Sequence, residues 1–399
     1  MRRSLRLPIV LVAALVVAEA GVLILRPELP PAPAVDPQSY FSSDQIADAE
    51  DYRSAQLAFY GLRLALEIGT LAILAARLPR RLTRPTRHPV LLGAAAGAGL
   101  SLLLGLVTLP VRVASREQAK EVGLVTQDWL GYAFDVVRSE AIGALIAAVG
   151  AALLILALRR LGSHWWVAGA AAIVAYGAAL TFLAPVVTEP LFNDFEPLPA
   201  GALRSEVLVL AERADVDVGE VYVVDASRRT RSANAYVAGL GATKRVVLYD
   251  TLLRDFRPDE VRLIVAHELG HVRHRDLPNG LLYVALVAPV GMLAAALLAE
   301  RITPRGARRG PAAVPAVALA AVLVATPISM ISNQLSRAVE RRADAYSLEL
   351  TGDPESLIAM QRRLSIRNLS DPSPPAWVTF LLSTHPPAAE RIARAEAAR

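Results

Sequence analysis

The chain of 399 residues contains no cysteine, which excludes disulfides, thiolate metal ligands and a cysteine nucleophile. Without cysteine, a metal site must use histidine, aspartate and glutamate as ligands, and the chain has only six histidines. Charged residues make up only 20% of the chain, and the formal net charge is +5. Because the arginines gather at the ends of apolar stretches, this charge reports membrane topology and not nucleic-acid binding.

Long apolar stretches are the most prominent feature that is present. Apolar residues make up 54% of the chain, and the mean hydropathy is +0.40. Seven stretches are long enough to cross a bilayer, at residues 7–25, 57–78, 89–109, 142–158, 165–187, 280–299 and 312–331. The sequence therefore predicts a polytopic α-helical membrane protein with about seven transmembrane helices. A secretory signal peptide is the alternative for the first stretch, since Ala18-Glu19-Ala20 resembles a cleavage site, but the apolar run continues to Leu25.

Between the fifth and sixth stretches the chain becomes polar and mixed, from Thr188 to Asn279. Its pattern predicts a helix over residues 203–213 and short strands over 221–224 and 245–249. We therefore expect two regions. Residues 1–187 form an N-terminal membrane region with five spans, and residues 188–399 form an α+β domain that includes the last two spans. The segments 26–53 and 112–140 are interpreted as a loop and a polar connection.

The arginines also predict an orientation. The N-terminus and the second, fourth and sixth loops are rich in arginine, and the first loop is acidic. Arginine-rich loops lie on the cytoplasmic side of a bacterial plasma membrane. This assignment places the segment Thr188–Asn279 and the polar C-terminal region on the extracytoplasmic side.

One pair of charges lies inside the second apolar stretch. Arg63 and Glu67 are four residues apart and can pair on one helix face. The pair is either a structural ion pair or part of a polar lining of an internal cavity.

The segment Pro258–Arg275 carries the strongest chemical signal. Its apolar residues recur at helical spacing, and Pro258 suits the first position of a helix. On that helix His267 and His271 are one turn apart, so both imidazoles can bind one tetrahedral Zn²⁺. Glu268 lies beside them, placed to take a proton from a water on the metal. This HExxH pattern is typical of zinc metalloendopeptidases, although a solvated helix with two histidines near its end also fits.

A catalytic zinc site needs a third protein ligand and a water. His274 follows on the same helix, but His267 and His271 already occupy the ligand face. Glu340 is the stronger candidate. After the helix that carries His267 and His271, two further membrane crossings return the chain to the side of the membrane where that helix lies. Asp344, one turn later, could accept the second N–H of a ligand histidine and fix its tautomer. A charged, solvated helix face is the alternative for both acidic residues.

Several motifs match one known family in the same order. They are Thr108–Pro110, Gly123–Asp128, Pro190–Leu198, Ser232–Gly239, Lys244–Leu252, the HELGH sequence at 267–271, Ser336–Asp344 and His385-Pro-Pro. With these motifs the chain resembles the integral-membrane zinc proteases of the CAAX prenyl protease 1 family, an HExxH type with glutamate as third ligand. The resemblance covers most of the chain from the third apolar stretch onward.

The resemblance implies one Zn²⁺ per chain, held by His267, His271 and Glu340, with Glu268 as general base. It also implies that Asn234, Ala235 and Tyr236 form a strand edge that binds an extended peptide, and that His385 stabilises the developing charge on the scissile carbonyl. The family encloses a large chamber within the membrane. The expected partners are membrane-associated peptide or protein substrates and the lipid bilayer, without nucleic acid.

Two other functions remain open. One is a membrane quality-control protease similar to the bacterial heat-shock membrane protease. The other belongs to a different class, a polytopic transporter or receptor in which zinc is structural. A structural site would have no open position for water, so adding zinc to stripped protein would produce no peptide cleavage.

Overall fold

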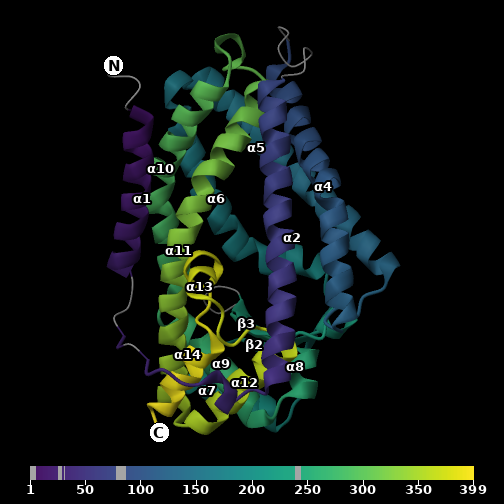
Figure 1. Cartoon of the computed structure of the whole chain (residues 1–399), viewed down its shortest axis with the longest axis vertical. Coiled ribbons are helices and arrows are strands. Elements are labelled where there is room, and N and C mark those ends of the chain that lie inside the picture. The colour runs from purple at the N-terminus through teal and green to yellow at the C-terminus, as the bar shows by residue number, and fades with distance from the viewer. Residues whose placement is uncertain (1–5, 26–28, 31, 78–86, 239–243) are drawn as a thin grey trace.

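The computed structural model describes residues 6–25, 29–30, 32–77, 87–238 and 244–399. Long helices form the upper part of an elongated molecule, and a smaller domain with a sheet lies at the lower end, near the C-terminus (Figure 1). Some residues named in the sequence analysis lie outside this description. They are Leu78 at the end of the second apolar stretch, Gly239 at the end of one motif, and Arg80, Arg81 and Arg84 of the second loop.

Seven helices in the described part of the chain are long and apolar enough to span a membrane, which confirms the predicted class. They are α1 (Arg6–Leu25), α2 (Ser43–Ala76), α4 (Pro89–Glu121), α5 (Trp129–Arg160), α6 (Trp165–Leu183), α10 (Asp276–Ile302) and α11 (Ala313–Thr351). Six of them form a closed ring of neighbours, in the order α2, α4, α5, α6, α10, α11 and back to α2. Helix α1 packs on the outside of this ring, against α10 and α11 (Figure 1).

Several of these helices extend beyond the predicted apolar stretches. The interpretation of residues 26–53 as a loop is wrong from Ser43 onward, because Ser42 and Gln45 form a capping box that starts α2 there. The segment 112–140 is also mostly helical, since α4 continues past Pro110 and Asp128 caps the start of α5. Hydropathy detects only the part of a helix that lies in lipid, whereas caps determine where the helix ends.

Helix α11 joins two elements that the sequence suggested separately. The predicted span 312–331 and the polar helix Asn333–Leu350 form one helix of 39 residues. At 1.5 Å per residue it is about 58 Å long. A single continuous helix therefore carries the membrane span and, beyond it, the acidic residues Glu340 and Asp344.

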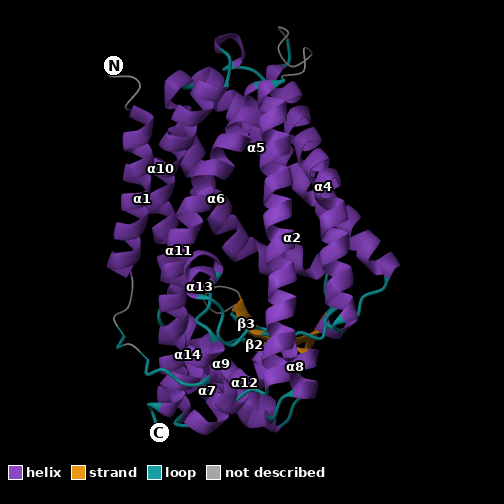
Figure 2. Ribbon diagram, viewed as in Figure 1, coloured by secondary structure: helices purple, strands orange, loops and turns teal. Residues whose placement is uncertain are grey.

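The sheet lies within the lower domain (Figure 2). Its strands are β1 (Phe195–Pro197), β2 (Glu220–Val224), β3 (Ala235–Ala238) and β4 (Arg245–Tyr249), in the order β1-β2-β4-β3. Strands β2 and β4 are parallel, with Val221 opposite Val246, and the other pairs are antiparallel. Strand β3 pairs only with β4 among the described strands, so it occupies an edge of the sheet.

Six helices complete this domain, and apolar residues between them and the sheet form its core. The helices are α7 (Ala202–Arg213), α8 (Asp250–Asp255), α9 (Pro258–Arg273), α12 (Pro354–Asn368), α13 (Ala376–Leu382) and α14 (Ala388–Glu396). Val207, Leu263, Leu357 and Ile392 are fully buried in one cluster. Helix α9 packs against α7, α12 and strand β3 of this domain, and the long helix α11 also packs against α9.

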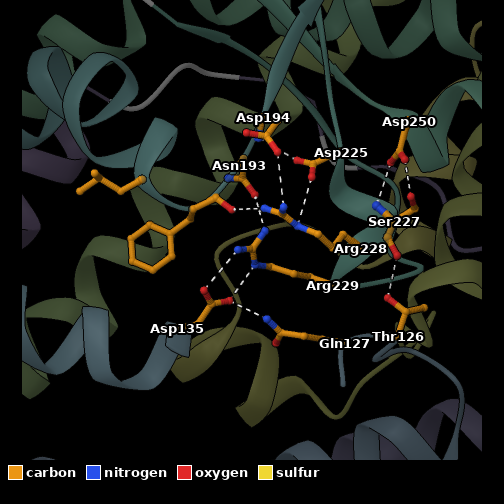
Figure 3. A network of polar contacts seen from close by, with 12 residues as sticks. Thr126, Gln127, Asp135, Asn193, Asp194, Asp225, Ser227, Arg228, Arg229 and Asp250 are labelled. Carbon is orange, nitrogen blue, oxygen red and sulfur yellow. Dashed lines mark hydrogen bonds and ion pairs between the residues drawn. The ribbon is translucent and has the colours of Figure 1, made fainter. Parts of the chain in front are cut away.

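A network of polar side chains joins the membrane helices to the sheet domain (Figure 3). Arg229, just after the short helix Ala226–Arg228, donates to both oxygens of Asp135 on α5, at 2.8 and 3.2 Å. Its neighbour Arg228 pairs with Asp194 at 3.4 Å and donates to the Phe192 carbonyl oxygen at 2.9 Å. We refer to Asp135, Arg228, Arg229 and Asp194 as the polar junction.

Candidate metal centre

Helix α9 is held firmly at its N-terminal end. Pro258 occupies the first turn, and the Glu260 carboxylate accepts from the Arg257 backbone N–H at 2.8 Å. Glu260 is fully buried and pairs with Arg363 of α12 at 3.0 Å. The helix ends at Arg273, two residues before the predicted end. Its apolar residues pack into the domain core, and the helix also packs against α11.

The close approach of α9 to α11 depends on a glycine. A Cβ atom at Gly270 would lie 3.3 Å from the Cα of Ala343 and 3.2 Å from the ring of Tyr346, both on α11. These distances are tighter than ordinary van der Waals contact. Gly270 therefore lets the two backbones come near enough for side chains of α11 to reach the α9 histidines.

Two imidazole nitrogens and a carboxylate converge between these helices. The Nε2 atoms of His267 and His271 lie 3.1 Å apart. Glu340 places its Oε2 atom 3.3 Å from His267 Nε2 and its Oε1 atom 3.6 Å from His271 Nε2. Ligand atoms around a tetrahedral zinc ion with bonds of about 2.0–2.1 Å are about 3.3 Å apart. The three predicted ligands therefore have the spacing that a tetrahedral ion requires.

Asp344 contacts His267 through the ring nitrogen that does not face Glu340. Its Oδ1 atom lies 2.9 Å from His267 Nδ1, so a hydrogen bond there leaves Nε2 free for a metal. Arg391 of α14 donates to both Asp344 oxygens, at 2.7 and 2.5 Å. Burial lowers the pKa of His267, but its hydrogen bonds to Asp344 and Glu340 outweigh burial and raise the pKa to about 10. The two carboxylates thus favour positive charge at this imidazole, whether it is a second proton or a metal ion.

Glu268, which follows His267 on α9, lies beside this cluster. One of its carboxylate oxygens lies within 4.8 Å of a ring nitrogen of His267 and of His271. Burial raises the pKa of the Glu268 carboxyl above its ordinary value, although the two neighbouring histidines oppose the shift. A carboxyl group whose pKa is raised in this way holds a proton more readily, which suits it to accept and return one.

His385 also reaches the centre, from the loop between α13 and α14. Its Nε2 atom lies 3.5 Å from Glu340 Oε1, and its Nδ1 atom lies 2.9 Å from the Thr384 hydroxyl. Arg337 of α11 donates to the carbonyl oxygens of Thr379 in α13 and of Ser383 at the start of this loop, each at 2.7 Å, and so connects the loop to α11. The side chain of His385 is largely exposed, so its free edge can face a bound molecule.

A cavity of about 710 Å³ adjoins His385. Asn234 lines the same cavity, at the start of strand β3. The other two predicted peptide-binding residues differ from it, since Ala235 is buried in the domain core and the Tyr236 hydroxyl donates to Glu189 at 2.6 Å. The structure therefore places the beginning of the edge strand beside the metal centre.

The remaining histidines do not join this cluster. His274 caps the end of α9, and its ring packs against Tyr346 with 5.3 Å between centroids. His88 precedes α4 and His164 precedes α6, at the opposite ends of these membrane helices from the sheet domain (Figure 1). This agrees with the sequence interpretation, in which none of the three is a ligand.

Two contacts at the centre lay outside the sequence analysis. Asp276 accepts a hydrogen bond from His271 Nδ1, with 2.9 Å between the atoms, and Arg391 holds Asp344. Asp276 is five residues after His271, a spacing that places two residues on different faces of a continuous helix. Arg391 comes six residues after His385, and nothing in the sequence around it indicates that its side chain reaches the metal centre. Neither residue had a spacing signal that could have indicated its role.

Taken together, two histidines and a glutamate at ligand spacing, with a second glutamate beside them, in a chain with seven candidate membrane spans, indicate an integral-membrane metallopeptidase. Comparisons with known proteins agree. The sequence profile described as Peptidase family M48 matches residues 197–399. The metalloprotease YhfN of Bacillus subtilis, whose name carries the word uncharacterized, is 30% identical over 383 residues, which cover 93% of this chain and 90% of YhfN.

Two further comparisons concern eukaryotic proteins. The CAAX prenyl protease 1 homolog of Oryza sativa is 31% identical over 218 residues, or 53% of this chain and 51% of the rice protein. The crystal structure of Ste24p from S. mikatae shares the fold, with a TM-score of 0.76, 20% identity and 99% coverage of both chains. The chain belongs to Peptidase family M48, and its class is that of the membrane zinc metallopeptidases, which act on peptides.

Proposed function

We propose that this protein is a zinc metalloendopeptidase that cleaves membrane-associated peptide or protein substrates, with one zinc ion held by His267, His271 and Glu340. The observation that carries the proposal is the convergence of two Nε2 atoms and one carboxylate at 3.1–3.6 Å. Nitrogen and oxygen donors at this spacing suit zinc, for which a two-histidine, one-glutamate set leaves a fourth position open.

A bound zinc ion supplies a Lewis acid that lowers the pKa of water toward 7 and polarises a carbonyl group. Glu268 accepts a proton from the attacking water and then donates it to the leaving amine. Asp344 holds His267 in the tautomer that presents Nε2 to the ion. His385 donates a hydrogen bond toward the carbonyl oxygen as negative charge develops there.

The substrate lies as an extended strand along the edge that begins at Asn234, Ala235 and Tyr236. Strand β3 has one partner strand among those described, and Asn234 and His385 line one cavity. Backbone hydrogen bonds to an edge strand bind a peptide with little demand on its sequence. In this proposal residues 1–187 form the membrane region and residues 188–399 the peptidase domain.

The peptidase domain lies on the extracytoplasmic side of a bacterial plasma membrane. The C-terminal ends of α5 and α10 and the turn between α10 and α11 lie at the end of the molecule opposite the sheet domain. These segments carry Arg159, Arg160, Arg301, Arg308 and Arg309, so the positive-inside rule places the cytoplasm at that end. Because the chain has no cysteine, single cysteines at the exposed positions Ser205 and Gly306 can be labelled from either side. We expect a membrane-impermeant reagent added outside to label Ser205→Cys only, and labelling of Gly306→Cys alone would reverse the orientation.

The Glu268→Gln variant tests the reaction. We expect it to bind zinc like the wild type and to lose about 10²- to 10⁴-fold of its peptidase rate, the usual contribution of a general base. Glu206→Gln, on the exposed face of α7, is the matched control and should keep full activity. The assay uses an internally quenched extended peptide and the full chain in detergent. Full activity of Glu268→Gln would end the proposal.

The alternatives named above are not better supported. The relatives named here are a metalloprotease and a CAAX prenyl protease 1 homolog, which favours peptide cleavage over transport or signalling. A transporter or receptor with structural zinc would still predict a zinc-loaded protein that does not cleave the quenched peptide.

A further inference from the structure

The second histidine of the centre has a carboxylate partner of its own. His271 Nδ1 lies 2.9 Å from Asp276 Oδ2, and the Asp276 side chain is only 8% exposed. The other oxygen of Asp276 accepts from the Arg342 guanidinium on α11. His271 is therefore followed by a carboxylate and then by an arginine, all within hydrogen-bonding distance.

A corner in the backbone makes this contact. If α9 continued, Asp276 would be rotated by about 140° from His271 around the helix axis and could not reach its ring. Instead α9 ends at Arg273, and Arg275 adopts left-handed backbone angles, φ 56° and ψ 42°, before α10 begins at Asp276. Such angles are unfavourable for a residue other than glycine, and conformations of this kind persist where the surrounding structure requires them.

The arrangement repeats the one at the first histidine. His267 is backed by Asp344 and Arg391, and His271 by Asp276 and Arg342. The two arginines come from different helices, α14 and α11. Both imidazoles thus point their Nε2 atoms toward one position while a carboxylate holds each Nδ1 atom.

From this geometry we infer that Asp276 is a positioning residue, which together with Arg342 fixes the tautomer and ring orientation of His271 as a metal ligand. The inference rests on the proposed zinc site. A carboxylate on Nδ1 keeps the proton there, so Nε2 carries the lone pair that binds the ion. Arg342 holds the Asp276 carboxylate in place by a charge-assisted hydrogen bond. A merely structural role, such as an acidic residue in the first turn of α10, would act on stability and not on the metal.

The test measures zinc dissociation constants by competition with a chelator, on the full chain in detergent. We expect Asp276→Ala to weaken zinc binding by about 10- to 100-fold, the usual effect of losing such a partner. Arg342→Gln should weaken it in the same direction and less. Asp276→Asn, which keeps an oxygen acceptor and the side-chain size, should lie between wild type and Asp276→Ala.

Asp255→Asn is the matched control, because Asp255 also accepts from an arginine of another helix, Arg367, at a site away from the histidines. It should leave the zinc constant within twofold of wild type. The visible spectrum of the cobalt-substituted protein gives a second measure, since ring rotation at His271 changes the ligand field. We expect altered bands for the Asp276 variants and unchanged bands for Asp255→Asn.

The outcomes separate the inference from the function on which it rests. If wild type binds zinc but Asp276→Asn and Arg342→Gln bind it within twofold as tightly and with unchanged cobalt bands, the positioning role is wrong. The fraction of unfolded protein is measured for the metal-free form of each variant. If this fraction alone accounts for the weaker zinc binding, the role of Asp276 is structural and the inference is again overturned. Absence of zinc binding in the wild type would instead refute the proposed function.

Discussion

The metal centre and the polar junction are built from the same kinds of side chains, yet they differ in burial. At the centre, Asp344 is 2% exposed and its partner Arg391 is 13% exposed. At the junction, Asp135 and Arg229 are about one-fifth exposed, while Arg228 and Asp194 are 50% and 79% exposed. Water screens the outer pairs and is excluded from the inner one, so equal numbers of hydrogen bonds have unequal consequences.

The comparison also separates two tasks. Each network joins segments that are distant in sequence: α9, α11 and α14 at the centre, and α5 with the segment after β2 at the junction. The junction fixes one part of the molecule on another and tolerates water. The centre holds ligand atoms at fixed spacing, which depends on the hydrogen bonds between the two histidines and the carboxylates of Asp344 and Asp276.

Removal of Asp344 should have the largest effect on stability. In Asp344→Ala the buried Arg391 guanidinium loses both acceptor oxygens, and His267 loses its partner on Nδ1. Breaking a buried pair by removing one member costs about 3–5 kcal/mol. Unfolding of the metal-free protein in mixed micelles measures this change, and a loss below about 1 kcal/mol would show that water reaches the pair.

Removal of Asp135 should have a smaller effect. Asp135→Ala takes two acceptor oxygens from Arg229 and one from Gln127, but at a site that water reaches. We expect a loss of about 1–2 kcal/mol in the same unfolding assay, and a zinc constant within twofold of wild type. A large change in zinc affinity would contradict the separation of the two networks.

Removal of Arg228 should have the smallest effect. Its pair with Asp194 is exposed, and exposed pairs contribute about 0–1 kcal/mol. Arg228→Ala should therefore differ little from wild type, and increasing salt should reduce even that difference. A loss comparable to that of Asp344→Ala would mean that burial does not set the order.

The sequence predicted the parts of the molecule that local patterns determine. The seven spans followed from hydropathy, and strand β4 matches the predicted residues 245–249, because β-branched and aromatic residues (Val246, Val247 and Tyr249) are concentrated in that short run. The ligands His267 and His271 followed from helical spacing. Glu340 needed an argument about topology, since two membrane crossings separate it from them. The structure places all three within ligand distance of one another.

Other features depend on contacts that no local pattern reveals. The left-handed backbone conformation at Arg275 is not marked by a glycine in the sequence. The contact between Asp276 and His271, which depends on it, could therefore not be predicted. The polar junction was also missed, because neighbouring charges such as Arg228 and Arg229 are most often solvated. The continuous helix α11 was divided in two, since hydropathy falls where the helix leaves the membrane. In each case tertiary packing decides.

The central claim is one ion held jointly by α9 and α11, and diffraction at the zinc absorption edge tests it most directly. Crystals of the full chain, purified without chelators, should show one anomalous peak per chain. We expect this peak at about 2.0–2.2 Å from His267 Nε2, His271 Nε2 and a Glu340 oxygen. A zinc-free protein with full peptidase activity, or an ion that touches only one of the two helices, would contradict the account.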